Sequence, residues 1–417
     1  MIRDVSWTGI VKVAYLAAQM AVSIVLARTM GAENFGFYAL VMAYVQLLIV
    51  PVQLGFPSSL VRHMSQMATN GEGLAARALL RIAVVSVLSV GLLVALGWAF
   101  SGYLLRPADL IPVGFLILGL ALTDVGGAAL RGLGSVVESQ VAQQLLRPGV
   151  YLALLGCAVW LSQGLDPQRA LALHAVAAVL ATIFALARSG SRIARLPLEG
   201  TSGSPRAILM ASLPFLLLAS IQILNYQVVL VVVGMKFDTA DIGIYRTAMQ
   251  IADALGVVLF AFSTALGPRI VQLQTQGRFH ALKRLLVRSH LAAIAVMLPL
   301  AGGVALFAEQ IISLIFGAEY AEGAAPLAIL AIGKILYAGV AFSGLGLSML
   351  GRPGRTTVAL STGLVLNVAL VFALIPAFGL QGAAWATVLA AFAGNLLAAF
   401  YLYTDIWRKT SRQDQRI

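Results

Sequence analysis

Long apolar segments alternate with short polar loops along the whole sequence. A run of about 18 or more apolar residues is long enough to cross a lipid bilayer as a helix. The pattern therefore predicts an all-α polytopic membrane protein with about twelve transmembrane helices. Their expected ranges are 6–29, 36–61, 78–101, 110–130, 144–164, 169–188, 207–234, 242–268, 286–308, 324–349, 356–376 and 380–404.

Two of these helices begin with the same short pattern, Gly-x-Tyr. It reads Gly36-Phe37-Tyr38 at the second helix and Gly243-Ile244-Tyr245 at the eighth, an offset of 207 positions that also brings Arg62 onto Arg269. Internal repeats of this kind are typical of membrane transporters. We therefore predict two matched, pseudo-symmetric halves.

A polar stretch rich in Gly and Ser, 189–206, lies between the sixth and seventh predicted helices. Such composition is typical of a linker. It predicts a six-helix N-terminal lobe over 1–188 and a six-helix C-terminal lobe over 207–417. The C-terminal lobe ends in a short basic tail.

Composition supports the membrane class. Hydrophobic residues make up 60% of the 417 positions and charged residues only 11%, with a mean hydropathy of +0.94, whereas ordinary chains carry roughly 25% charged residues. The single cysteine, Cys157, excludes an internal disulfide and a cysteine metal cluster. The four histidines are scattered, so no metal site is predicted.

The distribution of the charged residues, whose net charge is +12, indicates the orientation of the chain in the membrane. All but six of the 28 Lys and Arg fall on one set of chain ends and loops, and cytoplasmic loops carry this excess. Both termini and the linker are therefore predicted to be cytoplasmic, with the protein in the cell inner (plasma) membrane. The loops on the other side are too short for a folded catalytic domain, so we do not expect an enzyme.

Polar residues within predicted helices indicate where a substrate could bind, because polar groups at bilayer depth normally face a cavity or a partner. Arg246, Gln250 and Asp253 follow one another at i, i+4 and i+7, on one helical face. Arg246 and Asp253 are about 10 Å apart along the axis, so we expect them to line a cavity rather than form a direct ion pair. A polar helix–helix contact is the alternative.

Other predicted cavity residues lie mainly in the opening hairpins of the two halves. Lys12 could instead extend to the membrane interface, and Lys334 could be a cavity charge or half of a buried pair. Asp124 has no cation one helical turn away, and it joins Asp253 as a candidate for binding a coupling ion. The remaining cavity candidates are Gln19, Gln46 (which falls on Asp253 under the offset), Gln222 and Asn225.

Several short motifs resemble a known family. The outer-loop sequence from Arg28 to Leu40, Leu54-Gly55-Phe56-Pro57 in the same hairpin and Leu350-Gly351-Arg352 after the tenth helix resemble those of polysaccharide-type flippases. These flippases belong to the multidrug/oligosaccharidyl-lipid/polysaccharide (MOP) exporter superfamily. The resemblance extends over the whole chain in span count, orientation and halves.

This resemblance implies a MATE-like fold, two six-helix bundles around a central cavity that opens alternately to each side. It also implies a substrate, an undecaprenyl-pyrophosphate-linked oligosaccharide moved from the cytoplasmic to the periplasmic leaflet for O-antigen or exopolysaccharide synthesis. No cofactor is expected, although H+ or Na+ is a candidate coupling ion. A polysaccharide polymerase and glycosyltransferases are candidate partners. The chain has fewer intramembrane cations than strongly anion-selective relatives are expected to have, which leaves the charge of the glycan open.

Two other functions fit part of the sequence. A cation-coupled multidrug antiporter of the same superfamily needs a carboxylate in a lobe, and Asp124 and Asp253 keep that alternative open. A membrane enzyme of glycan assembly is disfavoured by the short outer loops. Drug-resistance assays distinguish the first alternative from a flippase, and turnover of lipid-linked glycan to a longer polymer distinguishes the second.

Overall fold

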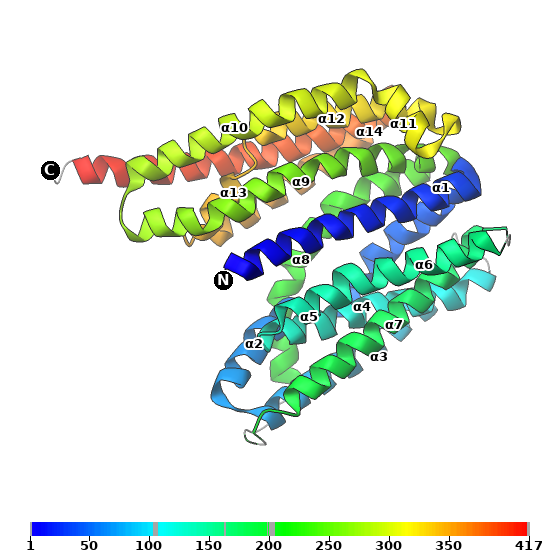
Figure 1. Ribbon diagram of the computed structural model, residues 1–417, viewed down its shortest axis with the longest axis horizontal. Helices are drawn as coiled ribbons and strands as arrows, with labels where there is room; N and C mark the ends of the chain where they lie inside the picture. The colour runs from blue at the N-terminus through cyan, green and yellow to red at the C-terminus, as the bar shows by residue number, and fades with distance from the viewer. Residues whose placement is uncertain (1, 103–106, 162–163, 198, 200–204, 415–417) are drawn as a thin grey trace. The chain divides into compact units, whose positions relative to one another are not determined.

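The computed structural model describes residues 2–102, 107–161, 164–197, 199 and 205–414, which form helices joined by short turns (Figure 1). The helices up to Ile193 are α1 (Ile2–Gln53), α2 (Phe56–Asn70), α3 (Gly73–Ser101), η1 (Pro107–Asp109), α4 (Leu110–Gly132), α5 (Val136–Gln140), the π-helical η2 (Val141–Leu146), α6 (Arg147–Trp160) and α7 (Pro167–Ile193). Those that follow are α8 (Pro205–Lys236), α9 (Thr239–Thr275), α10 (Phe279–Leu306), α11 (Ala308–Phe316), η3 (Ala318–Gly323), α12 (Ala324–Ala338), α13 (Ser343–Met349) and α14 (Pro353–Asp414).

Within the described residues, eight helical segments are long and apolar enough to cross a membrane. Two of them contain a sharp kink, α1 at Gly31 (φ 76°, ψ 169°) and α14 at Gly379 (φ 59°, ψ −138°). Each kink falls at or beside the loop predicted between two spans. Dividing both helices there, and adding α8 and the α5–η2–α6 run, gives the twelve predicted helical segments.

Two predicted spans are interrupted. The second was expected to run over 36–61, but α1 ends at Gln53 and α2 begins at Phe56. Gly55 between them has φ +75°, and a Cβ there would collide with the backbone oxygen of Ser212. A left-handed backbone and a close approach by α8 both require glycine, and the turn therefore forms at this point.

The tenth predicted span, 324–349, is also interrupted, between α12 and α13. Backbone hydrogen bonds of the i→i−3 type tighten the chain here, including Val340 N to Tyr337 O at 2.9 Å and Ser343 N to Val340 O at 3.1 Å. The Phe342 amide also donates to Nε2 of His290 on α10, at 3.4 Å. Because these contacts satisfy the backbone groups, the break is tolerated within an apolar bundle.

The chain divides into two compact units, Met1–Ile223 and Leu224–Ile417, with the boundary inside α8. Of the linker predicted at 189–206, residues 198 and 200–204 lie outside the described residues, and the proposed lobe boundaries remain a prediction. The carbonyls of Pro197 and Glu199 accept hydrogen bonds from the amides of Gly73 and Leu74, at 2.9 and 3.2 Å. This part of the segment therefore lies against the start of α3.

In the first unit, α4 packs most extensively against α7 and also contacts α1, α2 and α3. The α4–α7 contact depends on small residues, because a Cβ on Gly119 would lie 3.0 Å from Cβ of Ala178, and one on Gly126 would lie 2.8 Å from Cβ of Ala185. Small residues at such spacing let membrane helices approach closely. The unit is thus built around α4, which carries Asp124.

In the second unit, α12 contacts α9, α10 and α14. Its core includes the fully buried side chains of Phe342, Leu347, Leu402 and Ile406. The close approach of α9 and α12 is the part of this packing that matters for the site, since each helix carries a charged residue toward the other.

Candidate functional site

A polar cluster lies in the second unit, where α8, α9 and α12 meet. Asp253 of α9 pairs with Lys334 of α12, with 3.1 Å between Oδ1 and Nζ. The other Asp253 oxygen accepts a hydrogen bond from the Tyr226 hydroxyl of α8 at 2.5 Å. That hydroxyl in turn accepts from Nη1 of Arg246 at 3.1 Å. One carboxylate is therefore held between a lysine and a tyrosine that also contacts an arginine.

Tyr226 is the bridge of this cluster. Its ring lies 5.8 Å from the Arg246 guanidinium, within the range of a cation–π contact. Because Arg246 and Asp253 are two helical turns apart on α9, the phenol is well placed to span the distance between them. Tyr226 retains 37% of its surface exposure, and the side chains of Lys334 and Asp253 retain 26% and 34%. The cluster is thus accessible from outside the packed core of its unit.

The charge of the cluster is unbalanced in favour of cations. Arg246 and Lys334 bring two positive charges and Asp253 brings one negative charge. Lys334 and the Tyr226 hydroxyl donate to the two carboxylate oxygens of Asp253, and Arg246 donates to that hydroxyl. Phosphate oxygens can accept the same kind of charge-assisted hydrogen bond. The arrangement is therefore chemically suited to exchange its own carboxylate for an incoming anion.

The predicted polar face of α9 supplies only part of the cluster, because α8 and α12 contribute the other residues. Arg246 and Asp253 do share a face, but Tyr226 joins them. Lys334, for which a cavity charge and a buried pair were both considered, forms an ion pair that is partly exposed. Gln250 lies half-buried on α9 between the two charged residues.

The predicted polar residues of α8 have separate positions. Asn225 donates from its side chain to the Leu360 carbonyl at 3.4 Å, and its own carbonyl accepts from Asn367 at 3.1 Å. These bonds tie α8 to α14, which gives Asn225 a structural role. Gln222 is exposed on α8 and belongs to the first unit.

In the first unit, Lys12 and Gln19 meet at a tyrosine. Nζ of Lys12 lies 5.1 Å from the centre of the Tyr15 ring, and the Gln19 amide donates to the Tyr15 hydroxyl at 3.0 Å. Tyr15 therefore links two of the predicted cavity residues of α1. Gln46 lies half-buried farther along the same helix.

Asp124 forms a second carboxylate site in the first unit. Its Oδ2 accepts from Nε2 of Gln53 at 2.7 Å. Gln143 donates to the Asp124 carbonyl at 3.3 Å and accepts from Nη1 of Arg131 at 2.7 Å. Asp124 was expected to lack a cation one turn away, and its contacts indeed come from residues distant in sequence.

Gln143 links Asp124 to Arg131, and its position depends on local backbone geometry. Gln143 lies in the π-helical turn η2, and such turns often occur at functional sites. A Cβ on Gly127 would collide with the Gln143 amide. Gly127 thus leaves the room that the amide occupies beside Asp124.

Tyr226 and Gln53 stand among the polar residues of the predicted helices, but neither they nor Gln143 were among the predicted site residues. Tyr226 adjoins Asn225 in a helix that is otherwise apolar, and this proximity was the available signal. Gln53 and Gln143 reach Asp124 across 71 and 19 positions. Contacts over such separations depend on the packing of α1, α4 and η2, which the periodicity of one segment does not report.

Comparison with known sequences identifies the class of the chain. The model of the family described as "Polysaccharide biosynthesis protein" matches residues 1–274, and that of the MatE family matches 214–373. A "probable low-salt glycan biosynthesis flippase", Agl15 of Haloferax volcanii, is 24% identical over 383 residues, which cover 90% of this chain and 78% of the relative.

Solved structures share the fold. An inward-facing multidrug resistance MATE family transporter of the MOP superfamily superposes with a TM-score of 0.74 at 13% identity, covering 95% of this chain and 96% of the other. The lipid II flippase MurJ, in an inward closed conformation, gives a TM-score of 0.73 at 13% identity, covering 96% and 89%. The predicted MATE-like, all-helical fold is confirmed.

Proposed function

The chain belongs to the polysaccharide biosynthesis protein family and is a multi-pass membrane transporter rather than an enzyme, and from this premise we propose its substrate and direction. The substrate is an oligosaccharide repeat unit linked to undecaprenyl pyrophosphate. It moves by alternating access from the cytoplasmic to the periplasmic leaflet of the inner membrane. The observation that carries the proposal is the accessible Arg246–Tyr226–Asp253–Lys334 cluster.

The pyrophosphate is the part of this substrate that cannot enter hydrocarbon unaided. A phosphate oxygen about 4 Å from Arg246 gains roughly 4 kcal/mol at an effective dielectric near 20, and desolvation takes some of that back. Lys334 and the Tyr226 hydroxyl offer donors that now hold Asp253. In the proposed mechanism the pyrophosphate displaces the carboxylate, polar side chains contact the sugars and the prenyl chain stays in lipid.

Coupling to H+ or Na+ is part of the same proposal. Asp253 is a candidate because it shares partners with the substrate, so its protonation would release Lys334 and Tyr226 for the pyrophosphate. Asp124 is the other candidate, since its carboxylate is held by the Gln53 amide inside the first unit. We expect one of the two to make transport depend on the ion gradient.

A cation-coupled multidrug antiporter is the second candidate function. The match of the MatE family model to residues 214–373 and the carboxylate of Asp124 favour it. An antiporter would confer drug resistance on expression, whereas a flippase would restore surface glycan to a flippase-null strain.

For the flippase we also propose that both termini are cytoplasmic. A polysaccharide polymerase and glycosyltransferases are its proposed partners.

Complementation of a flippase-null strain tests the assignment of Arg246. We expect Arg246→Ala to lose most surface glycan while the amount of the protein in the membrane, measured by immunoblot, stays normal. Arg246→Lys should retain part, because the charge remains and the forked donor does not. Arg169→Ala is the matched control, since Arg169 is exposed at the start of α7 and donates to the Gly164 carbonyl. Full activity of Arg246→Ala would remove Arg246 from the substrate site.

A further inference from the structure

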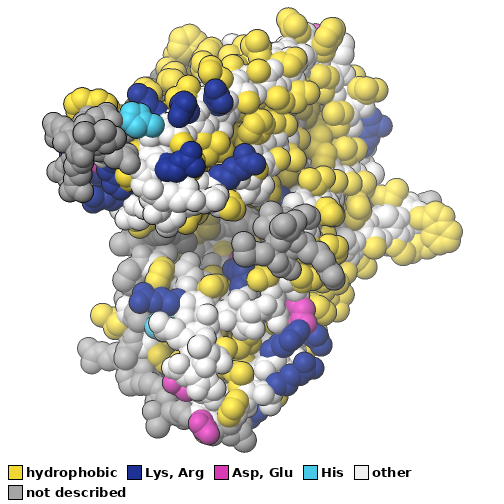
Figure 2. All heavy atoms as spheres, turned by 60° about the vertical axis from the view of Figure 1, so that its left-hand side comes forward, with side chains coloured by type: hydrophobic (Ala, Val, Ile, Leu, Met, Phe, Trp, Pro, Cys, Tyr) yellow, Lys and Arg dark blue, Asp and Glu magenta, His cyan; other side chains and the backbone are white. Residues whose placement is uncertain are grey.

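A stripe of basic side chains opens helix α10. His280, Lys283, Arg284 and Arg288 recur at i, i+3, i+4 and i+8, which places them on one helical face. All four are exposed, and together with Val287 they line an open pocket of about 550 Å³. Among the described side chains, this lining includes no Asp or Glu. In Figure 2, Lys and Arg side chains and a His gather on one face, next to hydrophobic side chains.

The same face of α10 becomes apolar within one turn. Val287, Leu291 and Leu298 are 40%, 60% and 57% exposed. From Arg288 to Leu298 the helix rises about 15 Å, which is half the thickness of a hydrocarbon core of about 30 Å. A cationic segment followed by one leaflet's depth of exposed apolar side chains has the dimensions of a single lipid.

The end of α14 lies at the same depth in the membrane as the basic stripe of α10. Nζ of Lys409 lies 5.1 Å from the centre of the Phe279 ring, so the end of α14 lies beside the start of α10. Trp407, on the same turn, is 65% exposed, and exposed Trp is enriched at membrane–water interfaces. The nearby carboxylate of Asp405 pairs with Arg355 at 2.6 Å. The headgroup region therefore begins where the basic stripe lies.

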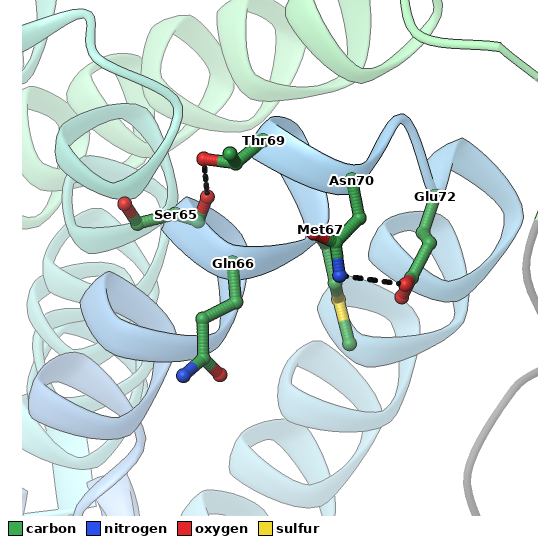
Figure 3. A pocket seen from close by; sticks show the side chains of 6 residues that line it. All are labelled: Ser65, Gln66, Met67, Thr69, Asn70 and Glu72. Carbon is green, nitrogen blue, oxygen red and sulfur yellow. Dashed lines mark hydrogen bonds between the residues drawn. The ribbon is translucent and has the colours of Figure 1, made fainter.

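The first unit provides an internal comparison. Under the 207-position offset, Arg284 and Arg288 correspond to Arg77 and Arg81 on α3, but His280 and Lys283 correspond to Gly73 and Ala76. The pocket beside the start of α3 is polar and contains the carboxylate of Glu72, which accepts from the Asn70 amide at 2.9 Å (Figure 3). Its lining residues are Ser65, Gln66, Met67, Thr69, Asn70 and Glu72. The concentration of cations is thus particular to α10 and is not a simple product of the repeat.

We propose that the basic stripe of α10 binds the phosphate headgroup of an anionic membrane phospholipid, whose acyl chain lies along Val287, Leu291 and Leu298. Arg and Lys form charge-assisted hydrogen bonds to phosphate, and basic residues at a membrane surface attract anionic lipid. The site is separate from the Arg246 cluster and does not depend on the transported substrate. Occupancy of the stripe gives this transporter a preference for acidic lipid at the basic end of α10.

Lipid retention by the purified full-length protein tests this proposal. Native mass spectrometry would compare phosphatidylglycerol with phosphatidylcholine of the same acyl chains, added to wild type and to the triple variant Lys283→Gln, Arg284→Gln, Arg288→Gln. We expect wild type to retain phosphatidylglycerol preferentially and the triple variant to lose at least about tenfold in apparent affinity. Arg77→Gln, Arg81→Gln is the matched control and should lose much less.

Further arms separate this site from the substrate site. Arg246→Ala should retain phosphatidylglycerol like wild type, whatever its effect on transport. Equal loss in the α10 and α3 variants, or unchanged retention in the α10 variant, would overturn the proposal. Stronger retention of a long-chain prenyl diphosphate than of phosphatidylglycerol, abolished by the triple variant, would also overturn it, because the stripe would then be a substrate-loading site.

Discussion

Tyr38 and Tyr245, which lie 207 positions apart, both hydrogen-bond to the last predicted helix of their own half, 169–188 for the first and 380–404 for the second. The Tyr38 hydroxyl is 2.8 Å from Nδ1 of His174 on α7. The Tyr245 hydroxyl is 3.3 Å from Oγ1 of Thr387, in the part of α14 that follows Gly379. Each partner lies roughly two turns into its segment. The shared contact is what two structurally equivalent tyrosines would make.

The two tyrosines should differ in their contribution to stability. Tyr38→Phe leaves the half-buried His174 without this hydrogen bond, although the imidazole still stacks on the Tyr151 ring at 4.3 Å. We expect a loss of about 1–3 kcal/mol in unfolding free energy. Tyr245→Phe should cost less, because Thr387 also donates to the Ala383 carbonyl. Thermal unfolding of the purified proteins in one detergent compares them, and a larger loss for Tyr245→Phe would contradict the expectation.

The Asp253–Lys334 pair should behave as a coupled unit. Asp253→Asn and Lys334→Gln each leave a charge without its partner, so the double variant should lose less stability than the two single losses added together. We expect a coupling energy of about 0.5–3 kcal/mol. A double-mutant cycle on unfolding free energy measures it, with Gln250→Ala as the control on the same helix. Strict additivity would indicate that the ion pair contributes nothing to the fold.

Glu138 gives the first unit a pH dependence at its surface. Hydrogen bonds from Arg192 and then Arg188 hold the pKa of its carboxyl at about 2, below the ordinary 4.5. A lowered pKa means that this stabilisation is complete above pH 4.5 and is lost as the pH falls toward 2. The difference in melting temperature between wild type and Glu138→Gln should therefore be constant from pH 7 to 5 and shrink below 4.5. A difference that grows on acidification would contradict this assignment.

Adding one methyl group at Gly127 tests whether the space that the Gln143 side chain occupies is needed for stability. Gly127→Ala should displace the Gln143 amide and cost about 1–3 kcal/mol, and adding Gln143→Ser should restore part of the loss. Gly156→Ala on α6 is the control, because a Cβ there meets no atom within 4 Å; it should be neutral or stabilising by up to about 1 kcal/mol. Thermal unfolding reports both, and a silent Gly127→Ala would mean that the amide moves freely.

Membrane topology provides a test that is independent of the site. Reporters fused after Ile417 and inserted within 200–204 should be active only when the reporter requires the cytoplasm. The reason is the concentration of Lys and Arg on that side. Paired cytoplasmic and periplasmic reporters at each position supply the control. Periplasmic activity at either position would reverse the predicted orientation.

The sequence predicts those features of the fold that depend on the residues of a single segment, such as the breaks between adjacent spans. The break between the first two spans appears at Gly31, which the offset places on Asp238, the residue that precedes α9. The break at Gly55 was not predicted, because it depends on the approach of Ser212, 157 positions away. Local apolar patterns do not encode such crossings.

The candidate site shows the same limit. Spacing along α9 was enough to place Arg246 and Asp253 on one face. Lys334 lies 81 positions from Asp253, and only the packing of α9 against α12 brings them together. Tyr226 enters from a third helix, and its role as a bridge follows from its length and its hydroxyl, which a hydropathy pattern does not distinguish from other apolar side chains.

The internal carboxylate of the cluster bears on turnover. A transporter that held a pyrophosphate with two unopposed cations would bind it tightly and release it slowly. Under the proposed function, Asp253 competes with the headgroup for Lys334 and the Tyr226 hydroxyl, weakens the binding of the headgroup and replaces it as it leaves. On this proposal Lys334 keeps a counterion during the return to the empty state. The proposed exchange at the Asp253–Lys334 pair thus favours fast return of the transporter to its empty state over high affinity for the headgroup.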